Sequence, residues 1–257
     1  MRRPSEPPAR SRRARGRSGA VTGPLPADHP CAGCAARLET FCRILDAETL
    51  ARFKALGSTH RAEPHQCLFH EDDPTRFVYN LTRGTLKLYQ LLPDGRRQIV
   101  GFVHAGDFLG LGMDTAHAFT AEAVEAAEYC RIARGPFARF LDGHRGLARE
   151  LYLTAAQDLA EAREQMTVLG RKRADERLAT FLLELSNRMP PPRARPEVVR
   201  LAMNRTDIAD YLGLTKETVC RAFTALRKAG LIGLVPGHGV ELIRRRGLEA
   251  LAGGDPD

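Results

Sequence analysis

The spacing of hydrophobic and polar positions changes along the chain, and each spacing predicts a different kind of element. Between residues 66 and 132, short apolar runs alternate with turns rich in glycine, proline and aspartate. The clearest runs predict strands at Cys67–Phe69, Phe77–Leu81, Thr85–Leu92 and Gln98–Val103. Pro93-Asp94-Gly95 predicts a hairpin turn between two of them. Many short strands at this spacing are typical of a small antiparallel roll or jelly roll.

A long helix is predicted after these strands, from Arg145 to Leu169. Its apolar positions recur at alternating steps of four and three residues, which is the heptad pattern of a two-helix coiled coil. The positions in this seam are Ala148, Tyr152, Ala155, Leu159, Ala162, Met166 and Leu169. A narrow seam with charged neighbours favours a second copy of the chain as the partner, so we expect a homodimer. The alternative is packing on the same subunit's roll through Leu147, Leu151 and Leu153.

The segment from Leu201 to Leu231 has the pattern of a helix-turn-helix. Asn204 or Thr206 can cap a first helix with one apolar face, formed by Ile208, Ala209 and Leu212. Gly213-Leu214-Thr215 supplies the turn, and Thr215 caps a second helix that buries Val219, Ala222, Phe223 and Leu226. The outward positions of that second helix are then Lys216, Glu217, Cys220, Arg221 and Thr224. A small helical hairpin with a merely solvated charged face is the alternative.

The outward residues suit a double-stranded DNA partner. A helix in the major groove reads bases with its N-terminal residues. Arg221 can fork onto a guanine and Glu217 can accept from a cytosine amino group, whereas Lys216 suits a phosphate. The flanking pattern predicts a hinge at Gly170, a helix from Ala174 to Met189 closed by Pro190–Pro192, and a wing. The wing comprises Val198–Leu201 and Gly233–Ile243, with a turn at Pro236–Gly239.

Most of the net positive charge lies in one segment. The 257 residues carry a formal net charge of +8, and residues 1–20 hold seven arginines against Glu6, a balance of 7 − 1 = +6. Pro, Ser, Arg and Gly dominate this segment, so we expect a disordered basic tail, favoured as a dispensable extension over a second DNA contact. There is no 18-residue apolar run and no secretory apolar region, which predicts a cytoplasmic protein with no membrane partner.

Six cysteines in a protein expected in the cytosol indicate metal or redox chemistry rather than disulfides. Cys31, Cys34 and Cys42 follow one another with two and seven residues between them, and Cys130 lies at the end of the roll. Four thiolates suit an iron–sulfur cluster or Zn²⁺, and the spacing alone leaves both open.

The remaining candidate ligands have other interpretations. Cys67 in an apolar strand is interpreted as a small buried hydrophobic residue. Cys220, near a helix N-terminus, is open to a redox role or to plain packing. His60, His65 and His70 have no regular ligand spacing and are interpreted as surface residues.

The helix-turn-helix resembles the DNA-binding domain of the CRP/FNR family of bacterial transcription regulators. The matching residues are Asp207-Ile208, Tyr211–Thr215 and Glu217–Arg221. The resemblance implies that Glu217 and Arg221 contact base pairs of a TTGA-type half-site. Cys220 stands where the FNR branch usually has serine, which affects contacts at the outer base pairs. A roll, a dimer helix and a winged helix-turn-helix, in that order over residues 29–252, also match the family's architecture.

The resemblance also implies which ligand or cofactor the roll and the cysteine segment bind. Cys31, Cys34, Cys42 and Cys130 map one by one onto the ligands of the 4Fe–4S site in FNR-type oxygen sensors, with the seven-residue second spacing of FnrN/FixK-related members. A cyclic nucleotide, bound by the CRP branch, needs a counter-charge, yet no Lys or Arg lies between Arg97 and Arg131. The Glu and the Arg-Ser pair that hold the nucleotide in that branch are also missing, so no cyclic nucleotide is expected.

The sequence thus predicts an α+β protein: a disordered tail (1–28), a cysteine segment (29–46), a cyclic-nucleotide-binding-like β-roll (47–144), a dimerisation helix (145–170) and a winged helix-turn-helix domain (171–257). We expect a homodimeric transcription regulator controlled by an oxygen-labile 4Fe–4S cluster, with RNA polymerase as a further partner. The alternatives are a regulator with structural zinc or no metal, and a small-molecule enzyme fused to a helix-turn-helix. No nucleophile elbow, P-loop or carboxylate pair supports catalysis.

Overall fold

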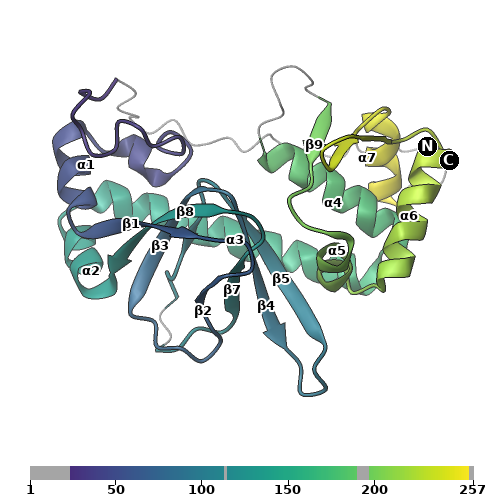
Figure 1. Ribbon diagram of the computed structural model, residues 1–257, viewed down its shortest axis with the longest axis horizontal. Coiled ribbons are helices and arrows are strands. Elements are labelled where there is room, and N and C mark those ends of the chain that lie inside the picture. Colours follow the sequence, from purple (N-terminus) through teal and green to yellow (C-terminus); the bar gives the residue numbers. More distant parts are fainter. Residues whose placement is uncertain (1–23, 113–114, 190–196, 255–257) are drawn as a thin grey trace, which may run out of the picture.

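Two four-stranded antiparallel sheets form the N-terminal part of the protein (Figure 1). The computed structural model describes residues 24–112, 115–189 and 197–254, so residues 1–23 of the predicted basic tail and the Pro190–Pro192 helix end lie outside the described residues. The predicted tail boundary at residue 28 is too late, because Leu25 already packs against the apolar core beneath the N-terminal helices. One sheet has the order β1-β8-β3-β6, comprising β1 (Gly57–Ala62), β8 (Ala127–Ala133), β3 (Phe77–Arg83) and β6 (Phe108–Leu109). The other has the order β2-β7-β4-β5, comprising β2 (Cys67–Phe69), β7 (Thr120–Ala123), β4 (Thr85–Leu91) and β5 (Arg97–His104).

The inner faces of the two sheets share an apolar core. Its fully buried members include Leu81, Leu86, Ala121 and Ala123. The β4–β5 hairpin turns at the predicted place, with Gly95 at a φ of +83°. The β-roll and the four strands predicted from apolar runs are confirmed, whereas β1 was not anticipated, because its sequence Gly-Ser-Thr-His-Arg-Ala has almost no apolar residues.

Helices cover the outer face of the β1-β8-β3-β6 sheet. They are the short 3₁₀ helix η1 (Phe41–Ile44), α1 (Ala47–Lys54), α2 (Arg134–Asp142) and the start of α3 (Arg145–Arg171). Asp46 caps α1 through its side chain, which accepts from the Thr49 N–H. A second apolar core forms between these helices and the sheet, from Phe41, Leu50, Phe53, Val78, Ile132, Phe137, Leu147 and Leu151.

Helix α3 connects the two halves of the molecule (Figure 1). Its 27 residues correspond to about 40 Å at 1.5 Å per residue. Leu147 and Leu151 pack on the roll, but Leu153 is 43% exposed. The alternative of packing on the roll therefore holds for Leu147 and Leu151 and is wrong for Leu153, because a step of two residues turns it about 200° around the helix from Leu151. Gly170 is also not the hinge, since α3 continues to Arg171 and the break falls at the extended residues Lys172 and Arg173.

The C-terminal part has the predicted winged helix-turn-helix. It contains α4 (Ala174–Arg188), β9 (Val198–Arg200), α5 (Arg205–Leu212), α6 (Lys216–Lys228), β10 (Gly233–Val235), β11 (Gly239–Glu241) and α7 (Arg245–Gly253). The strands pair in the order β10-β11-β9. The Asn204 side chain caps α5, Gly213 ends it at a φ of +61°, and the Thr215 side chain caps α6. The expected apolar faces of both helices are buried.

Charged side chains bind the two parts together. Lys87 of β4 lies 3.0 Å from Glu122 and 3.1 Å from Asp207 of α5, and its side chain is only 3% exposed. Arg97 of β5 contacts Asp207 at 3.0 Å and Asp210 at 2.8 Å. Ile99 and Phe102 of β5 belong to the same apolar core as the helix-turn-helix. Helix α5 of the helix-turn-helix is therefore seated directly on the β4–β5 hairpin.

Candidate functional site

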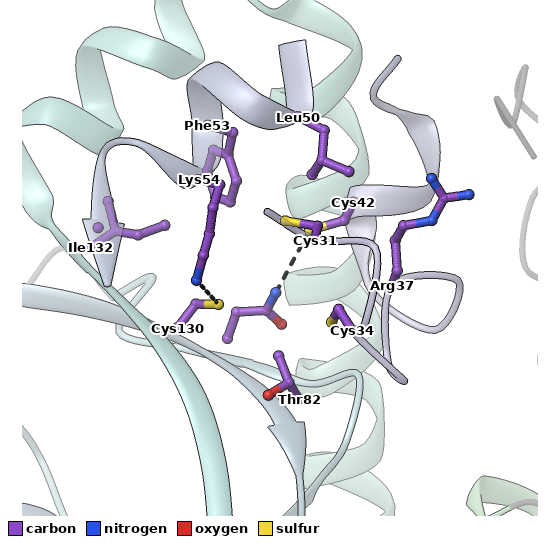
Figure 2. A pocket seen from close by; sticks show the side chains of 12 residues that line it. Cys31, Cys34, Arg37, Cys42, Leu50, Phe53, Lys54, Thr82, Cys130 and Ile132 are labelled. Carbon is purple, nitrogen blue, oxygen red and sulfur yellow. Dashed lines mark hydrogen bonds between the residues drawn. The ribbon is translucent and has the colours of Figure 1, made fainter. Parts of the chain in front are cut away.

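The four cysteines singled out in the sequence line one pocket. Cys31, Cys34, Cys42 and Cys130 lie on the wall of a pocket with an empty volume of about 390 Å³, which includes its opening to solvent. Figure 2 shows their sulfurs together with Lys54, Arg37 and Thr82 around this space. Three of the cysteines come from the N-terminal segment and the fourth from β8, so the fold joins positions about ninety residues apart.

Turns and a histidine hold the first two cysteines in place. The Cys31 N–H donates to His29 Nδ1 at 3.0 Å, while His29 Nε2 lies 2.9 Å from the carbonyl oxygen of Ala47. The ring thus links the cysteine segment to the first residue of α1. A tight turn follows, in which the Cys34 N–H donates to the Cys31 carbonyl at 3.2 Å. Both thiols remain half-buried.

Cys42 lies in η1 and is buried. Its N–H donates to the Thr40 hydroxyl at 3.0 Å, which caps the helix. Burial raises the pKa of the Cys42 thiol to about 12, although the hydrogen bond with Thr40 lowers it. The next residue, Arg43, forms an ion pair with Glu150 of α3, and both side chains are largely buried. Cys42 is therefore anchored to the long helix through its neighbour.

The sheet register places Cys130. Cys130 is paired with Thr59 of β1 on one side and with Asn80 of β3 on the other. Because alternate residues of a strand share a face, Cys130 points to the same side as the buried Ile132. Lys54, the last residue of α1, donates from Nζ to the Cys130 sulfur at 3.4 Å.

The donor set suits a soft metal centre. Burial raises the pKa of Cys31 and Cys34, Lys54 lowers both pKa values in part, and the neighbouring thiols raise them. Burial therefore favours the neutral thiols until a cation displaces their protons. Within the described parts of the chain, no three His, Cys, Asp or Glu side chains already converge closely enough to hold a metal ion. The four thiols share a pocket and must close in further to share a metal or cluster.

The predicted DNA-contacting residues share one exposed face of α6. Lys216, Glu217, Cys220, Arg221 and Thr224 are all exposed near its N-terminal half. The Arg221 guanidinium donates to the Thr218 hydroxyl at 3.1 Å, which holds it along the helix. Arg177 of α4 fixes the motif from behind, donating to the carbonyl oxygens of Leu169 and Leu212, each at 2.8 Å.

The heptad seam of α3 is open to solvent in the single chain. Six of its seven members are exposed, and Leu169 is half-buried. Tyr152 and Met166 are each 72% exposed and Leu159 is 52% exposed. Large apolar side chains in a line on one helix face are what a partner helix would cover.

The other cysteines and histidines lie elsewhere. Cys67 is half-buried rather than buried, because β2 is the edge strand of its sheet. Cys220 is exposed, as its position on α6 requires. His65 and His70 are exposed, whereas His60 is half-buried and stacks on Tyr129 with ring centroids 5.7 Å apart.

Sequence reasoning missed the residues that hold the cysteines. Lys54 of α1 contacts Cys130 and Asn80 of β3 contacts Cys42. Glu150 of α3 pairs with Arg43, the residue that follows Cys42. The one available signal was Asn80, a polar residue in the middle of the apolar strand sequence Phe-Val-Tyr-Asn-Leu. The others depend on tertiary contacts that no local pattern encodes.

A β-roll joined by a long helix to a winged helix-turn-helix defines a class of DNA-binding transcription regulators. Residues 59–144 match the cyclic nucleotide-binding domain and residues 176–251 match the Crp-like helix-turn-helix domain. The chain belongs to the CRP/FNR family, whose members are transcription regulators rather than enzymes. Among the helices of residues 24–254 that the structure describes, none has the length and apolarity to cross a membrane.

Individual relatives support the assignment to this family. The chain is 43% identical over 227 residues to the nitrogen fixation regulation protein FixK of Bradyrhizobium diazoefficiens, covering 88% of this chain and 95% of that one. It is 39% identical over 219 residues to the transcriptional activatory protein AadR of Rhodopseudomonas palustris, covering 85% and 91%. The structure is similar to that of FixK2 from Bradyrhizobium japonicum, with a TM-score of 0.71, 35% identity, and coverage of 76% of this chain and 96% of that chain.

Proposed function

We propose that this regulator senses oxygen through a 4Fe–4S cluster held by Cys31, Cys34, Cys42 and Cys130. The observation that carries the proposal is that these four cysteines, and neither Cys67 nor Cys220, line one pocket. Four thiolates are the ligand set of such a cluster, which when bound supplies an oxygen-labile redox centre. In this proposal the cytoplasmic homodimer binds a palindromic TTGA-type site and acts with RNA polymerase.

The contact between Arg43 and Glu150 supports a path from the cysteines to the dimer. Arg43 follows Cys42, and Glu150 lies on α3 between the seam residues Ala148 and Tyr152. Closing the four thiols around one group would draw η1 toward β8 and move Arg43 with it. The packing of α3 against a second copy then depends on the state of the pocket.

Replacing any one ligand is expected to abolish the bound cluster. Cys31→Ser, Cys34→Ser, Cys42→Ser and Cys130→Ser should each remove the brown colour from anaerobically purified protein, because a hydroxyl is a poor ligand for the soft iron–sulfur unit. The measurement is visible absorption with iron and sulfide content. Cys67→Ser and Cys220→Ser are the matched controls and should keep the colour.

The wild-type protein should also bind its DNA site more tightly before exposure to air than after it. A colourless anaerobic preparation with stoichiometric zinc, and with DNA affinity indifferent to air, would replace this function with that of a zinc-stabilised regulator. The same donor set suits Zn²⁺, so the metal content separates the two.

Base recognition is proposed to rest on Glu217 and Arg221, with Lys216 on a phosphate. Arg221→Ala is expected to cost about 1–3 kcal/mol at one guanine position and to relax specificity there. Lys216→Ala should weaken all sequences alike and reduce the salt dependence of binding. Binding to a panel of half-site variants checks both. An unchanged sequence preference in Arg221→Ala would contradict this docking of α6.

A further inference from the structure

Two side chains outside the cysteine set direct polar hydrogen atoms at its sulfurs. Lys54 donates from Nζ to the Cys130 sulfur at 3.4 Å, and Asn80 donates from Nδ2 to the Cys42 sulfur at 3.7 Å. Both line the pocket, and the dashed lines in Figure 2 mark the two contacts. Each contacts a cysteine from a different element, so the pair spans the pocket.

Secondary structure fixes the position of both donors. Asn80 lies directly across from Cys130 in the pairing of β3 with β8. Thr59 lies across from Cys130 on the other side, and Lys54 donates to the Thr59 hydroxyl as well as to the sulfur. Lys54 therefore crosses a neighbouring strand to reach Cys130. The two contacts hold the Lys54 ammonium group beside the pocket.

Asn80 is poorly explained by the needs of the fold alone. It is 3% exposed, and its Oδ1 is a buried atom with no hydrogen-bond partner among the residues that the structure describes. Leaving a buried polar atom unpaired costs free energy, whereas an apolar side chain of the same shape carries no such cost. The amide is thus better explained by what its N–H group does for the sulfur than by packing.

We propose that Lys54 and Asn80 are positioning residues of the metal centre. The inference rests on the proposed function and names the regulation of that same site. An ammonium group beside four thiolates reduces the repulsion between them when they close around one group. A hydrogen bond to the Cys42 sulfur holds that ligand in position and makes a bound cluster harder to oxidise. The first effect and the fixed ligand position favour retention of a bound metal or cluster, and the change in potential slows its loss to oxidants.

The test uses the full chain, prepared anaerobically, as Lys54→Met, Asn80→Leu and the charge-preserving Lys54→Arg. After reconstitution with iron and sulfide, we expect Lys54→Met and Asn80→Leu to lose their visible absorption in air several-fold faster than wild type. Co²⁺ titrated alone into the metal-free protein, followed by its thiolate charge-transfer absorption, should bind ten-fold or more weakly in both variants. Lys54→Arg should remain close to wild type in both measurements.

Thermal unfolding of the metal-free proteins separates positioning from structure. Asn80→Leu should unfold at the wild-type temperature or above it, because the unpaired amide oxygen is removed. A lower unfolding temperature with unchanged Co²⁺ affinity would mean a structural role and overturn the inference.

The inference and the proposed function fail in different ways. If the wild type holds a cluster and both variants lose it at the wild-type rate, the inference is wrong while the proposed function stands. If the wild type holds no cluster, the proposed function fails, and the Co²⁺ titration decides the inference. Equal Co²⁺ affinities, or no Co²⁺ binding by the wild type, would overturn it.

Discussion

A Leu159→Glu variant should sediment as a monomer and lose specific DNA binding. Leu159 lies at the middle of the α3 seam and is 52% exposed in the single chain. In a symmetric dimer the substitution removes the further burial of two half-exposed leucines, about 1 kcal/mol each, and sets two carboxylates against each other. A combined loss of about 2–3 kcal/mol raises the dissociation constant of the dimer about 30- to 150-fold. Sedimentation velocity over a range of concentrations measures it.

Leu153→Glu is the matched control. It makes the same change on the same helix at another exposed leucine, but Leu153 lies outside the seam. It should therefore stay dimeric and bind DNA as the wild type does. A dimeric Leu159→Glu, or two variants that behave alike, would show that the chains associate through another surface.

Lys87→Met should destabilise the protein more than any surface charge change. Lys87 is buried between Glu122 and Asp207, and its removal leaves the two carboxylates buried without that cation. Breaking a buried charge pair in this way costs about 3–5 kcal/mol. Urea denaturation followed by circular dichroism measures the loss. The DNA-binding domain should also separate from the roll more readily, because Asp207 belongs to α5.

Two further variants test whether the buried charge pairs cause the loss of stability in Lys87→Met. Arg61→Met breaks the pair of Arg61 with Glu128, in which the Arg61 side chain is 80% exposed, so it should cost less than about 1 kcal/mol. Adding Glu122→Gln to Lys87→Met removes one of the two carboxylates that lost this cation, while Asp207 keeps its pair with Arg97, and should recover part of the lost stability. A Lys87→Met protein as stable as Arg61→Met would mean that the buried charges contribute nothing.

The helix-turn-helix could be predicted from local sequence patterns alone. The caps at Asn204 and Thr215, the left-handed Gly213 and the buried faces of α5 and α6 are all decided within a few residues, so periodicity and capping rules identify them. The strands with alternating apolar residues were equally visible. The cysteine spacing selected Cys31, Cys34 and Cys42, and the family resemblance added Cys130, which lines the same pocket.

The features that could not be predicted depend on contacts between residues far apart in the sequence. Strand β1 exists because its backbone pairs with β8, although its side chains lack an apolar pattern. The hinge was assigned to Gly170 because glycine is a weak helix former, yet the capping box of Arg173 with Glu176 sets the break two to three residues later. The donors to the cysteine sulfurs, Lys54 and Asn80, come from a helix end and a neighbouring strand.

The ion pair between Arg43 and Glu150 has a thermodynamic consequence, because it ties the residue after Cys42 to the helix that carries the seam. Under the proposed function, occupancy of the cysteines and association of the two chains share one coupling free energy, and such coupling is reciprocal. If occupancy of the cysteines tightens the association of the two chains by some factor, association must tighten the binding of the group to the cysteines by the same factor. Dilution into monomers would therefore loosen that group, and a palindromic DNA site that holds two chains together would tighten it.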